Sequence, residues 1–543
     1  MGRADRMVSA LLIMTLGLPL LWAAWAAAMA ALDASAWQGL LADSQTLQAL
    51  GLTLWTGLLA SGLSVALAAW LMSHNFPGPA WARLVQALGP MLAVPHAAFA
   101  IGLAFLLAPS GWLLRALSPW ATGLDAPPPW ATTQDPWGLG LVLVLIAKEV
   151  PFLLWAAATQ LQRADVAQVW TRELLVARSM GYGPRAAWWR VLWPQLWPRL
   201  RWPMLAVLAY SLTVVDVALV IGPTTPPTLA VLAWQWLLDA DVTVNARGAA
   251  AAWLLALLVG AMAGLLWQVP RQPAWRTRWT TGARHAPAHL SMLARAGVVG
   301  LAALLCLYLA VMLSLAVGSV AGIWSFPAFW PQTLTTSAWA SVWGSLATMG
   351  TTLTLALGSA LVALLWSVAW LECAPALLID RLRRLIYLPL VLPPVLWVVG
   401  VHGLTLNWGI DATWAGLWLA HTLAAVPYVL IALSPAYTGF DPRFRHVAAS
   451  LGHGRAVFLW RVKWPLLRAA LASAFAVGFA VSVAQYLPTL FVGAGRFATV
   501  TTEAVTLASG AQRSLTAAYA WLQWLLPALV FGLAAWLGKP RRY

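Results

Sequence analysis

Charged residues are scarce in this sequence. Asp, Glu, Lys and Arg together make up 9% of its 543 residues, and 62% of the residues are hydrophobic. A soluble globular protein carries about 25% charged residues, so this chain could not cover a water-exposed surface. The composition therefore excludes an ordinary soluble protein and indicates one that is solvated by membrane lipid.

Cysteine is scarcer still, and the histidines are scattered. The two cysteines, Cys306 and Cys373, give neither a disulfide framework nor a metal-binding spacing. The apolar segments contain four histidines, His74, His96, His402 and His421. Their spacing does not match helical metal ligands, and the sequence suggests no Ser/His/Asp or Cys/His arrangement around them. We therefore expect no metal site and no catalytic centre in this chain.

Only three lysines occur, and none lies in a nucleotide-binding loop. Such a loop needs the pattern G-x-x-x-x-G-K-[S/T]. Lys148 and Lys463 have no such context, and Lys539 follows Gly538 but precedes Pro540. The sequence thus predicts no cofactor bound by the chain itself.

Long apolar runs, in contrast, are abundant. Twelve runs are centred near residues 20, 61, 96, 150, 212, 257, 306, 356, 395, 424, 480 and 528. A run of about 18 apolar residues can cross the bilayer as a helix. Strands of a membrane barrel are about half that length and alternate in polarity, which these runs do not. We predict an all-α polytopic membrane protein with about 12 transmembrane helices.

The basic residues fall on one side of these spans. With the N-terminus in the cytoplasm, 27 of the 32 Lys and Arg lie in cytoplasmic segments, as the positive-inside rule requires. This distribution explains the net charge of +16 without nucleic acid as a partner. It predicts a multi-pass membrane protein with both termini in the cytoplasm.

The N-terminal run resembles a signal peptide but is too long for one. It extends from Met7 to Leu32, whereas the apolar region of a cleavable signal has about 7–15 residues. We expect a retained first helix, with cleavage at the small residues near Ala26 to Ala31 as the alternative.

A short basic segment occurs twice. Residues 177–194 and 448–465 align without a gap and share 9 of 18 residues. The shared residues that we assign to partner coupling are Ala177, Ser179, Gly181, Gly183, Arg190 and Pro194, with Ala448, Ser450, Gly452, Gly454, Arg461 and Pro465 in the second copy. A basic loop that only fixes topology would not need this spacing of glycine and proline, so we expect a shared partner.

The rest of the chain repeats in the same order. Pro90 and Pro95 have the spacing of Pro389 and Pro394, and equivalent landmarks follow the same number of spans. The repeats are therefore parallel rather than inverted. We predict a first transmembrane domain at 1–269 with its loop at about 165–200, a cytoplasmic linker at 270–292, and a second transmembrane domain at 293–543 with its loop at about 441–468.

The spacing within each loop predicts a local structure. Glycine permits the tight reversal that ends a helix, and proline is best tolerated in the first turn of the next one. Gly181 precedes Pro194 by 13 residues, as Gly452 precedes Pro465. The pattern predicts a helix, a glycine turn, a surface helix with one face for a soluble partner, and proline at the entry to the membrane helix.

These two loops resemble the cytoplasmic E-A-A-x-x-x-G loop of type I ABC importer permeases, in which proline follows the glycine 13 residues later. Copy one supplies Val176, Ala177 and Gly181; copy two supplies Val447, Ala448 and Gly452. The acidic position is occupied by Leu175 and His446, so any salt bridge through that acid is lost. The resemblance covers nearly the whole chain and is closest to fused double permeases of the ferric-iron, thiamine and oxyanion branch.

The resemblance implies a location in the bacterial inner membrane and partner proteins that are separate from this chain. In that family the loop docks on a cytoplasmic ATPase, so two loops imply two ATPase subunits, identical because the loops are alike, which bind ATP and Mg²⁺. A periplasmic or lipid-anchored solute-binding protein would deliver the substrate. Thiamine, ferric iron, oxyanions and polyamines all remain open as substrates.

Four polar residues fall within or near the spans of the predicted translocation path. They are Lys148, Glu149, Asp216 and Gln485. Ionisable groups in a membrane are costly, and they either line a path or pair inside the helix bundle. Both interpretations stay open, although the charges occur in one half only.

Two other classes remain as alternatives. A 12-helix secondary transporter of the major facilitator type would also have two six-helix halves, but residues 72–83 lack its G-x-x-x-D-R-like signature. An intramembrane enzyme would need clustered acids or histidines at a membrane face, and the sequence has none.

Overall fold

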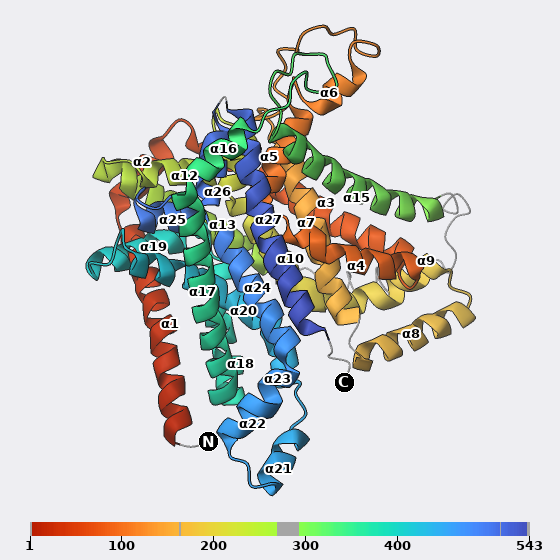
Figure 1. Cartoon of the computed structure of the whole chain (residues 1–543), viewed down its shortest axis with the longest axis vertical. Helices are drawn as coiled ribbons and strands as arrows, with labels where there is room; N and C mark the ends of the chain where they lie inside the picture. The colour runs from red at the N-terminus through yellow and green to blue at the C-terminus, as the bar shows by residue number, and fades with distance from the viewer. Residues whose placement is uncertain (1–2, 162–163, 269–292, 511, 540–543) are drawn as a thin grey trace. The chain divides into compact units, whose positions relative to one another are not determined.

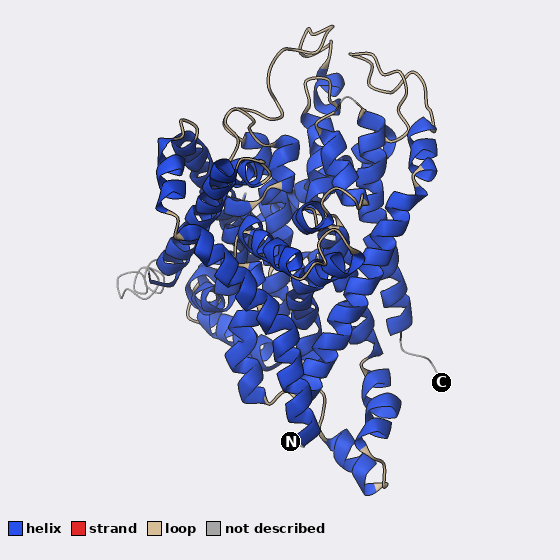
Figure 2. Ribbon diagram, turned by 90° about the vertical axis from the view of Figure 1, so that its left-hand side faces the viewer, coloured by secondary structure: helices blue, strands red, loops and turns tan. Residues whose placement is uncertain are grey.

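The computed structural model describes residues 3–161, 164–268, 293–510 and 512–539. Within these ranges every regular element is a helix, apart from one isolated bridge between Ala321 and Leu334 (Figures 1 and 2). The predicted all-α class is confirmed. The chain forms two compact units: unit 1 contains Met1–Asp33 and Thr336–Tyr543, and unit 2 contains Ala34–Thr335.

Unit 2 carries the first copy of the repeated loop. Its helices are α2 (Ala34–Ala42), α3 (Thr46–Asn75), α4 (Pro79–Ala93), α5 (His96–Leu107), α6 (Trp112–Leu117), α7 (Leu139–Leu161), α8 (Ala164–Ser179), α9 (Pro184–Ala187), the π-helical turn η1 (Trp188–Leu192), α10 (Trp193–Thr213), α11 (Asp216–Ile221), α12 (Leu229–Leu237), α13 (Val242–Gln268) and α15 (Leu293–Gly318).

Unit 1 carries the second copy. Its helices are α1 (Arg3–Ala31), α16 (Ser337–Gly344), α17 (Leu346–Cys373), α18 (Ala376–Ile386), the 3₁₀ turn η4 (Leu388–Leu390), α19 (Pro394–Asn407), α20 (Trp414–Thr438), α21 (Arg443–Ser450), α22 (Arg455–Phe458), the π-helical turn η5 (Leu459–Lys463), α23 (Trp464–Leu466), α24 (Arg468–Val483), α25 (Leu487–Gly493), α26 (Val500–Ala508) and α27 (Arg513–Gly538).

The first long helix of each sequence half packs in the unit built from the other half. α1 lies against α17 and α19 in unit 1, and the Trp366 indole N–H donates to the Leu12 carbonyl at 3.3 Å. α15 lies against α5 and α3 in unit 2, where Tyr308 Oη donates to the Ala147 carbonyl at 3.0 Å. Gly102 permits this approach, because a Cβ there would lie 2.7 Å from Val311 Cγ1.

The predicted division at 270–292 describes the sequence repeat, and these residues lie outside the described ranges. The compact units follow a different division, since both boundaries near residues 33 and 335 come after a first helix. The two-domain assignment by sequence thus stays a prediction about the repeat.

The described ranges contain nine helices long and apolar enough to cross a membrane. The segment from α22 to α23 meets α24 at a 75° bend, and counting these two parts as one span gives a tenth. The polytopic membrane class is confirmed. Two of the predicted twelve runs lack such a helix: the run near 212 falls on α10, which contains Pro198 and Pro203, and the run near 395 falls on the 14-residue α19.

Candidate coupling loops and intramembrane charges

The two copies of the repeated segment have the same backbone. In unit 2, α8 ends at Ser179, Gly181 has φ +88°, and α9 and η1 lead into α10. In unit 1, α21 ends at Ser450, Gly452 has φ +76°, and α22 and η5 lead into α23. The helix, glycine turn and second helix follow the predicted pattern in both copies. We call residues 176–194 and 447–465 the coupling loops, after the role that the sequence predicts for them.

Both glycine turns are closed by the same pair of hydrogen bonds. The Tyr182 N–H donates to the Ala177 carbonyl at 3.1 Å, and the Gly181 N–H donates to the Arg178 carbonyl at 3.0 Å. His453 and Gly452 repeat these bonds to Ala448 and Ala449 at 2.9 and 3.0 Å. This is the Schellman arrangement, which needs a left-handed residue at the position of the glycine.

The shared alanines and serines also have local reasons. Ala177 and Ala448 are buried, so a larger side chain would not fit beneath the turn. The Ser179 and Ser450 hydroxyls each donate to the carbonyl three residues earlier, both at 2.8 Å. These carbonyls also accept the backbone N–H of Met180 and of Leu451, so each serine adds a second hydrogen bond at the last turn of its helix.

A π-helical turn precedes the shared proline in both loops. The Trp193 N–H donates to the Trp188 carbonyl, and the Trp464 N–H donates to the Leu459 carbonyl, five residues back in each case. Arg190 and Arg461 lie within these turns. Proline has no N–H and its ring crowds the carbonyl four residues earlier. The wider turn accommodates Pro194 and Pro465 without breaking the chain of helices.

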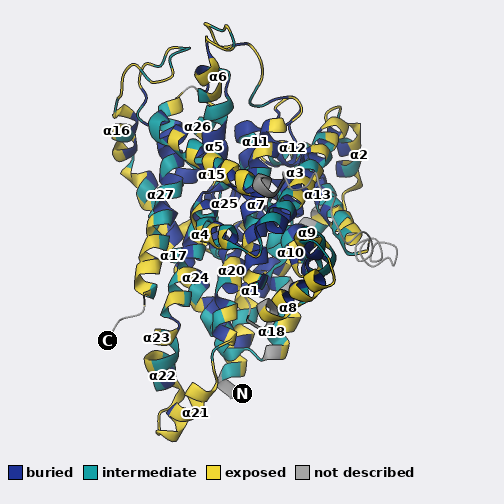
Figure 3. Cartoon of the chain, turned by 90° about the vertical axis from the view of Figure 1, so that its right-hand side faces the viewer, coloured by how far each residue is buried: buried dark blue, intermediate teal, exposed yellow. Residues whose placement is uncertain are grey.

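Sequence comparison missed one feature of the loops, a matched pair of exposed apolar side chains beside each glycine. Val176 and Met180 are 58% and 56% exposed, and the equivalent Val447 and Leu451 are 57% and 68% exposed. Figure 3 shows α21 largely exposed. Met180 in one copy corresponds to Leu451 in the other, so a search for identical residues did not select this position. Each loop presents a small apolar surface suited to another protein.

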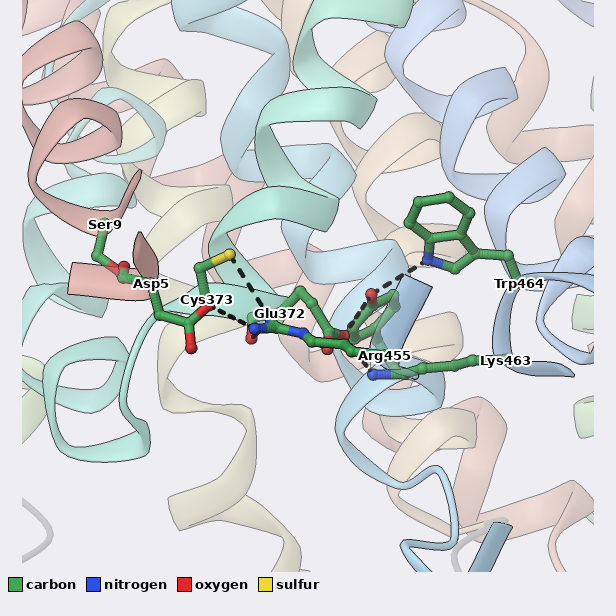
Figure 4. A network of polar contacts seen from close by, with 8 residues as sticks. Asp5, Ser9, Glu372, Cys373, Arg455, Lys463 and Trp464 are labelled. Carbon is green, nitrogen blue, oxygen red and sulfur yellow. Dashed lines mark hydrogen bonds and ion pairs between the residues drawn. The ribbon is translucent and has the colours of Figure 1, made fainter. Parts of the chain in front are cut away.

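The coupling loops are anchored by different contacts in the two units. In unit 2, the Gln195 amide donates to Glu173 at 2.6 Å and accepts from the Trp170 indole N–H at 3.0 Å, which ties α8 to α10. In unit 1, Arg455 and Lys463 bind acidic residues of α1 and α17 (Figure 4). In both units the loop is thus anchored by side chains other than those at the acidic position, Leu175 and His446.

Lys148 lies at a helix interruption in unit 2. Its side chain is 1% exposed, and its ammonium donates to the Met91 carbonyl at 3.0 Å and the Val94 carbonyl at 2.6 Å. These carbonyls belong to the end of α4, where the apolar run predicted near residue 96 breaks before His96. A cation at a helix C-terminus is favourable, so this geometry favours the pairing role over the path role.

Glu149, the next residue, pairs with a histidine that the sequence gave no reason to select. His96 Nε2 lies 3.3 Å from Glu149 Oε1, and the two side chains are 35% and 6% exposed. The His96 ring lies 4.7 Å from that of Tyr210. His96 begins α5, which packs against α11.

Asp216 and Gln485 occupy corresponding breaks in the two units. Asp216 is half-buried and begins α11, after α10 stops at Thr213. Gln485 lies between α24 and α25, and its carbonyl accepts from Thr489 at 3.1 Å. The unit-1 break is supported by neutral groups, since buried His421 contacts Ser482 at 2.8 Å and Thr489 at 3.0 Å. Lys148 thus lies at the α4–α5 interruption of unit 2, whereas His421 lies at the α24–α25 interruption of unit 1.

Comparisons with known proteins identify the family. No protein-family model matches the chain. The chain is 36% identical over 532 residues to the inner membrane ABC transporter permease protein YnjC of Escherichia coli (strain K12), covering 96% of this chain and 95% of that protein. The chain belongs to the ABC transporter permeases. This permease is therefore a multi-pass membrane protein.

Shorter matches agree with that assignment. The permease is 35% identical over 131 residues to the molybdenum transport system permease protein ModB of Mycobacterium tuberculosis, covering 22% of this chain and 50% of ModB. It is 26% identical over 108 residues to the spermidine/putrescine transport system permease protein PotC of Haemophilus influenzae, covering 20% of this chain and 42% of PotC. These relatives support an ABC importer permease rather than a secondary transporter of the major facilitator type. Such permeases work with an ATPase and a binding protein.

Proposed function

We propose that each coupling loop docks one subunit of a cytoplasmic ATPase dimer. The observation that carries this proposal is the repeated order of helix, left-handed glycine, short helix and π-helical turn in the two loops, each with an exposed apolar pair before the glycine. Two equivalent surfaces suit two identical subunits. ATP and Mg²⁺ bind to those subunits, because the only three lysines of this chain lie outside any phosphate-binding loop.

The topology follows from this proposal. Both coupling loops and both termini lie in the cytoplasm, as the distribution of Lys and Arg favours. A periplasmic or lipid-anchored binding protein delivers the substrate to the opposite face. ATP binding brings the ATPase subunits together, and their different affinity for the two arrangements of the loops shifts the permease between its inward-open and outward-open states.

The translocation path is proposed to pass the interrupted helices. Discontinuous helices commonly form substrate sites in transporters. Glu149 and Asp216 in unit 2 and Gln485 in unit 1 lie at or beside such interruptions. Lys148 is held by two backbone carbonyls, which supports a structural role for its charge.

The test uses the permease purified with its ATPase subunits and reconstituted in vesicles. Uptake of molybdate, spermidine, thiamine and ferric iron is measured with the binding protein present. Molybdate and spermidine are included because partial relatives are named for molybdenum and spermidine transport. We expect ATP-dependent uptake of one of them and co-purification of two ATPase subunits per chain. Solute movement by the chain alone, without any ATPase, would contradict the proposal.

Neutralising the path carboxylates should affect transport more than assembly. We expect Asp216→Asn to lower uptake of the transported solute about tenfold, because one lost charge contact is worth about 1.5–3 kcal/mol. ATPase binding should be unchanged, since Asp216 lies outside both coupling loops. Uptake and ATPase co-purification are measured on the same preparation. Normal uptake in Asp216→Asn and in Glu149→Gln would remove both residues from the path.

A further inference from the structure

The unit-1 coupling loop is joined to two distant helices by a network of charged side chains. Arg455 Nη1 lies 2.5 Å from Asp5 Oδ1 on α1, and Arg455 Nη2 lies 3.3 Å from Glu372 Oε1 near the end of α17. Lys463 Nζ lies 2.7 Å from Glu372 Oε2. Figure 4 shows Arg455 between Asp5 and Glu372, with Lys463 on the far side. Residues more than 350 positions apart in sequence therefore meet at one loop.

Glu372 is the centre of this network. Besides the two cations, its carboxylate accepts from Tyr437 Oη at 2.9 Å, and its main-chain carbonyl accepts from Arg455 at 3.2 Å. Tyr437 in turn accepts from the Trp464 indole N–H at 3.3 Å, and its ring lies 3.9 Å from the Lys463 ammonium. The shared tryptophan before Pro465 is thus part of the same network. Glu372 connects α17, α20 and both ends of the segment from Arg455 to Trp464.

The first copy of the loop lacks the matching groups. In the gap-free alignment Arg455 corresponds to Pro184, and Lys463 corresponds to the buried Leu192. Glu372 lies one residue before the end of α17, and the residue in the same place on α3 of unit 2 is His74. The His74 ring contacts the Trp70 carbonyl of its own helix at 2.8 Å. Among the described side chains, α15 joins the end of α3 through an amide contact, from Asn75 to the Gly297 carbonyl at 3.3 Å. Among the described residues, the Arg455–Asp5 ion pair joins the loop to α1 in unit 1.

Stability alone does not explain such a network. The Arg455 and Asp5 side chains are 38% and 18% exposed, and ion pairs with this exposure contribute little to folding. Their geometry does matter, because charge-assisted hydrogen bonds fix the position of both partners. α1 and α17 are long apolar helices, with 29 and 28 residues, so a displacement of the loop would be passed along two rigid elements.

We infer that Asp5 and Glu372 are positioning residues, which link the unit-1 coupling loop to α1 and α17 and so transmit its movement to the membrane helices. The inference rests on the proposed ATPase-docking role of the loop. It makes the two loops unequal: the unit-1 loop drives its helices through breakable ionic contacts, and the unit-2 loop acts through the Glu173, Gln195 and Trp170 contacts of α8 and α10.

Cys373 provides a native reporter of this linkage. It is partly exposed and its Sγ lies 3.9 Å from Arg455 Nη2, so a movement of Arg455 changes the surroundings of the thiol. With Cys306→Ser, Cys373 becomes the single cysteine of the chain. Its rate of maleimide labelling is compared between the nucleotide-free complex and the complex trapped with ATP and vanadate.

The experiment measures solute transported per ATP hydrolysed in the reconstituted complex, with Asp5→Asn and Glu372→Gln beside the wild type. We expect each variant to keep its ATPase subunits but to lower this ratio about fivefold, the low end of typical coupling between sites. The nucleotide-dependent change in Cys373 labelling should be lost. In the wild type alone, the ratio should also fall at high salt, because partly exposed ion pairs are screened.

Asp43→Asn is the matched control. Asp43, which lies between α2 and α3, pairs with Arg247 of α13 at 2.9 Å, outside the coupling loops. Its side chain is 18% exposed, as is that of Asp5. The Asp43→Asn variant should leave the ratio unchanged. A wild-type ratio in both Asp5→Asn and Glu372→Gln, or an equal loss in Asp43→Asn, would overturn the inference while the ATPase remains bound. Failure of the ATPase to bind the wild type would instead reject the proposed function.

Discussion

Replacing both Gly181 and Gly452 by valine should strongly weaken ATPase docking. The two glycines have φ of +88° and +76°, where a side chain strains the backbone. No atom lies within 4 Å of a Cβ built at either site, so the strain comes from the backbone alone. At about 1–2 kcal/mol for each loop, the double variant should lose roughly 30- to 700-fold in affinity for the ATPase dimer.

Two further variants separate docking from general damage. Asparagine tolerates the left-handed conformation, so the double asparagine variant should recover most of the affinity. Gly123→Val places the same strain at φ +67°, again with no atom within 4 Å, in a loop outside both coupling segments. It should bind ATPase normally. The affinity is measured by titrating purified ATPase onto the permease in nanodiscs; wild-type affinity in the double valine variant would refute the docking role.

Replacing Lys148 by methionine should prevent unit 2 from folding stably. The ammonium is the donor to the Met91 and Val94 carbonyls in a fully buried site. Each carbonyl left without a donor costs about 1–3 kcal/mol, so the total loss of about 2–6 kcal/mol is comparable to the stability of a domain. We expect a much smaller yield of monodisperse protein and a lower midpoint of thermal unfolding in detergent.

Leu145→Met is the matched control for this variant. Leu145 is buried on the same helix, three residues before Lys148, and an apolar exchange of similar volume costs less than about 1.5 kcal/mol. It should purify like the wild type. If Lys148→Met is instead fully stable but transports nothing, Lys148 belongs to the translocation path and its pairing with the carbonyls is incidental.

The coupling loops could be predicted from sequence because their structure is local. A left-handed glycine and a proline at a helix start are imposed by the backbone within a few residues, so Gly181 and Pro194 marked both elements. The π-helical turns were not predicted, since tryptophan, arginine and valine carry no signal for a five-residue repeat. The exposed Met180 and Leu451 were missed because apolar residues in a loop of this length could equally be buried.

The long-range contacts could not be predicted in the same way. Asp5 and Arg455 are 450 residues apart, and nothing in either neighbourhood shows that α1 packs in the unit of the second half. Lys148 could be recognised as costly, but its partners are main-chain carbonyls, which every residue possesses. The break at Val94 that exposes them precedes Pro95, which disfavours a helical residue before it, within a run whose apolar character alone indicated one continuous span.

The placement of α1 and α15 has a consequence for the gene as well as for the protein. Each folded unit takes its opening helix from the opposite half of the polypeptide. A cut between residues 269 and 292 would therefore yield two fragments that are each incomplete, and neither could mature without the other in equal amount. Fusion in a single reading frame supplies both halves together, at a fixed ratio of one to one.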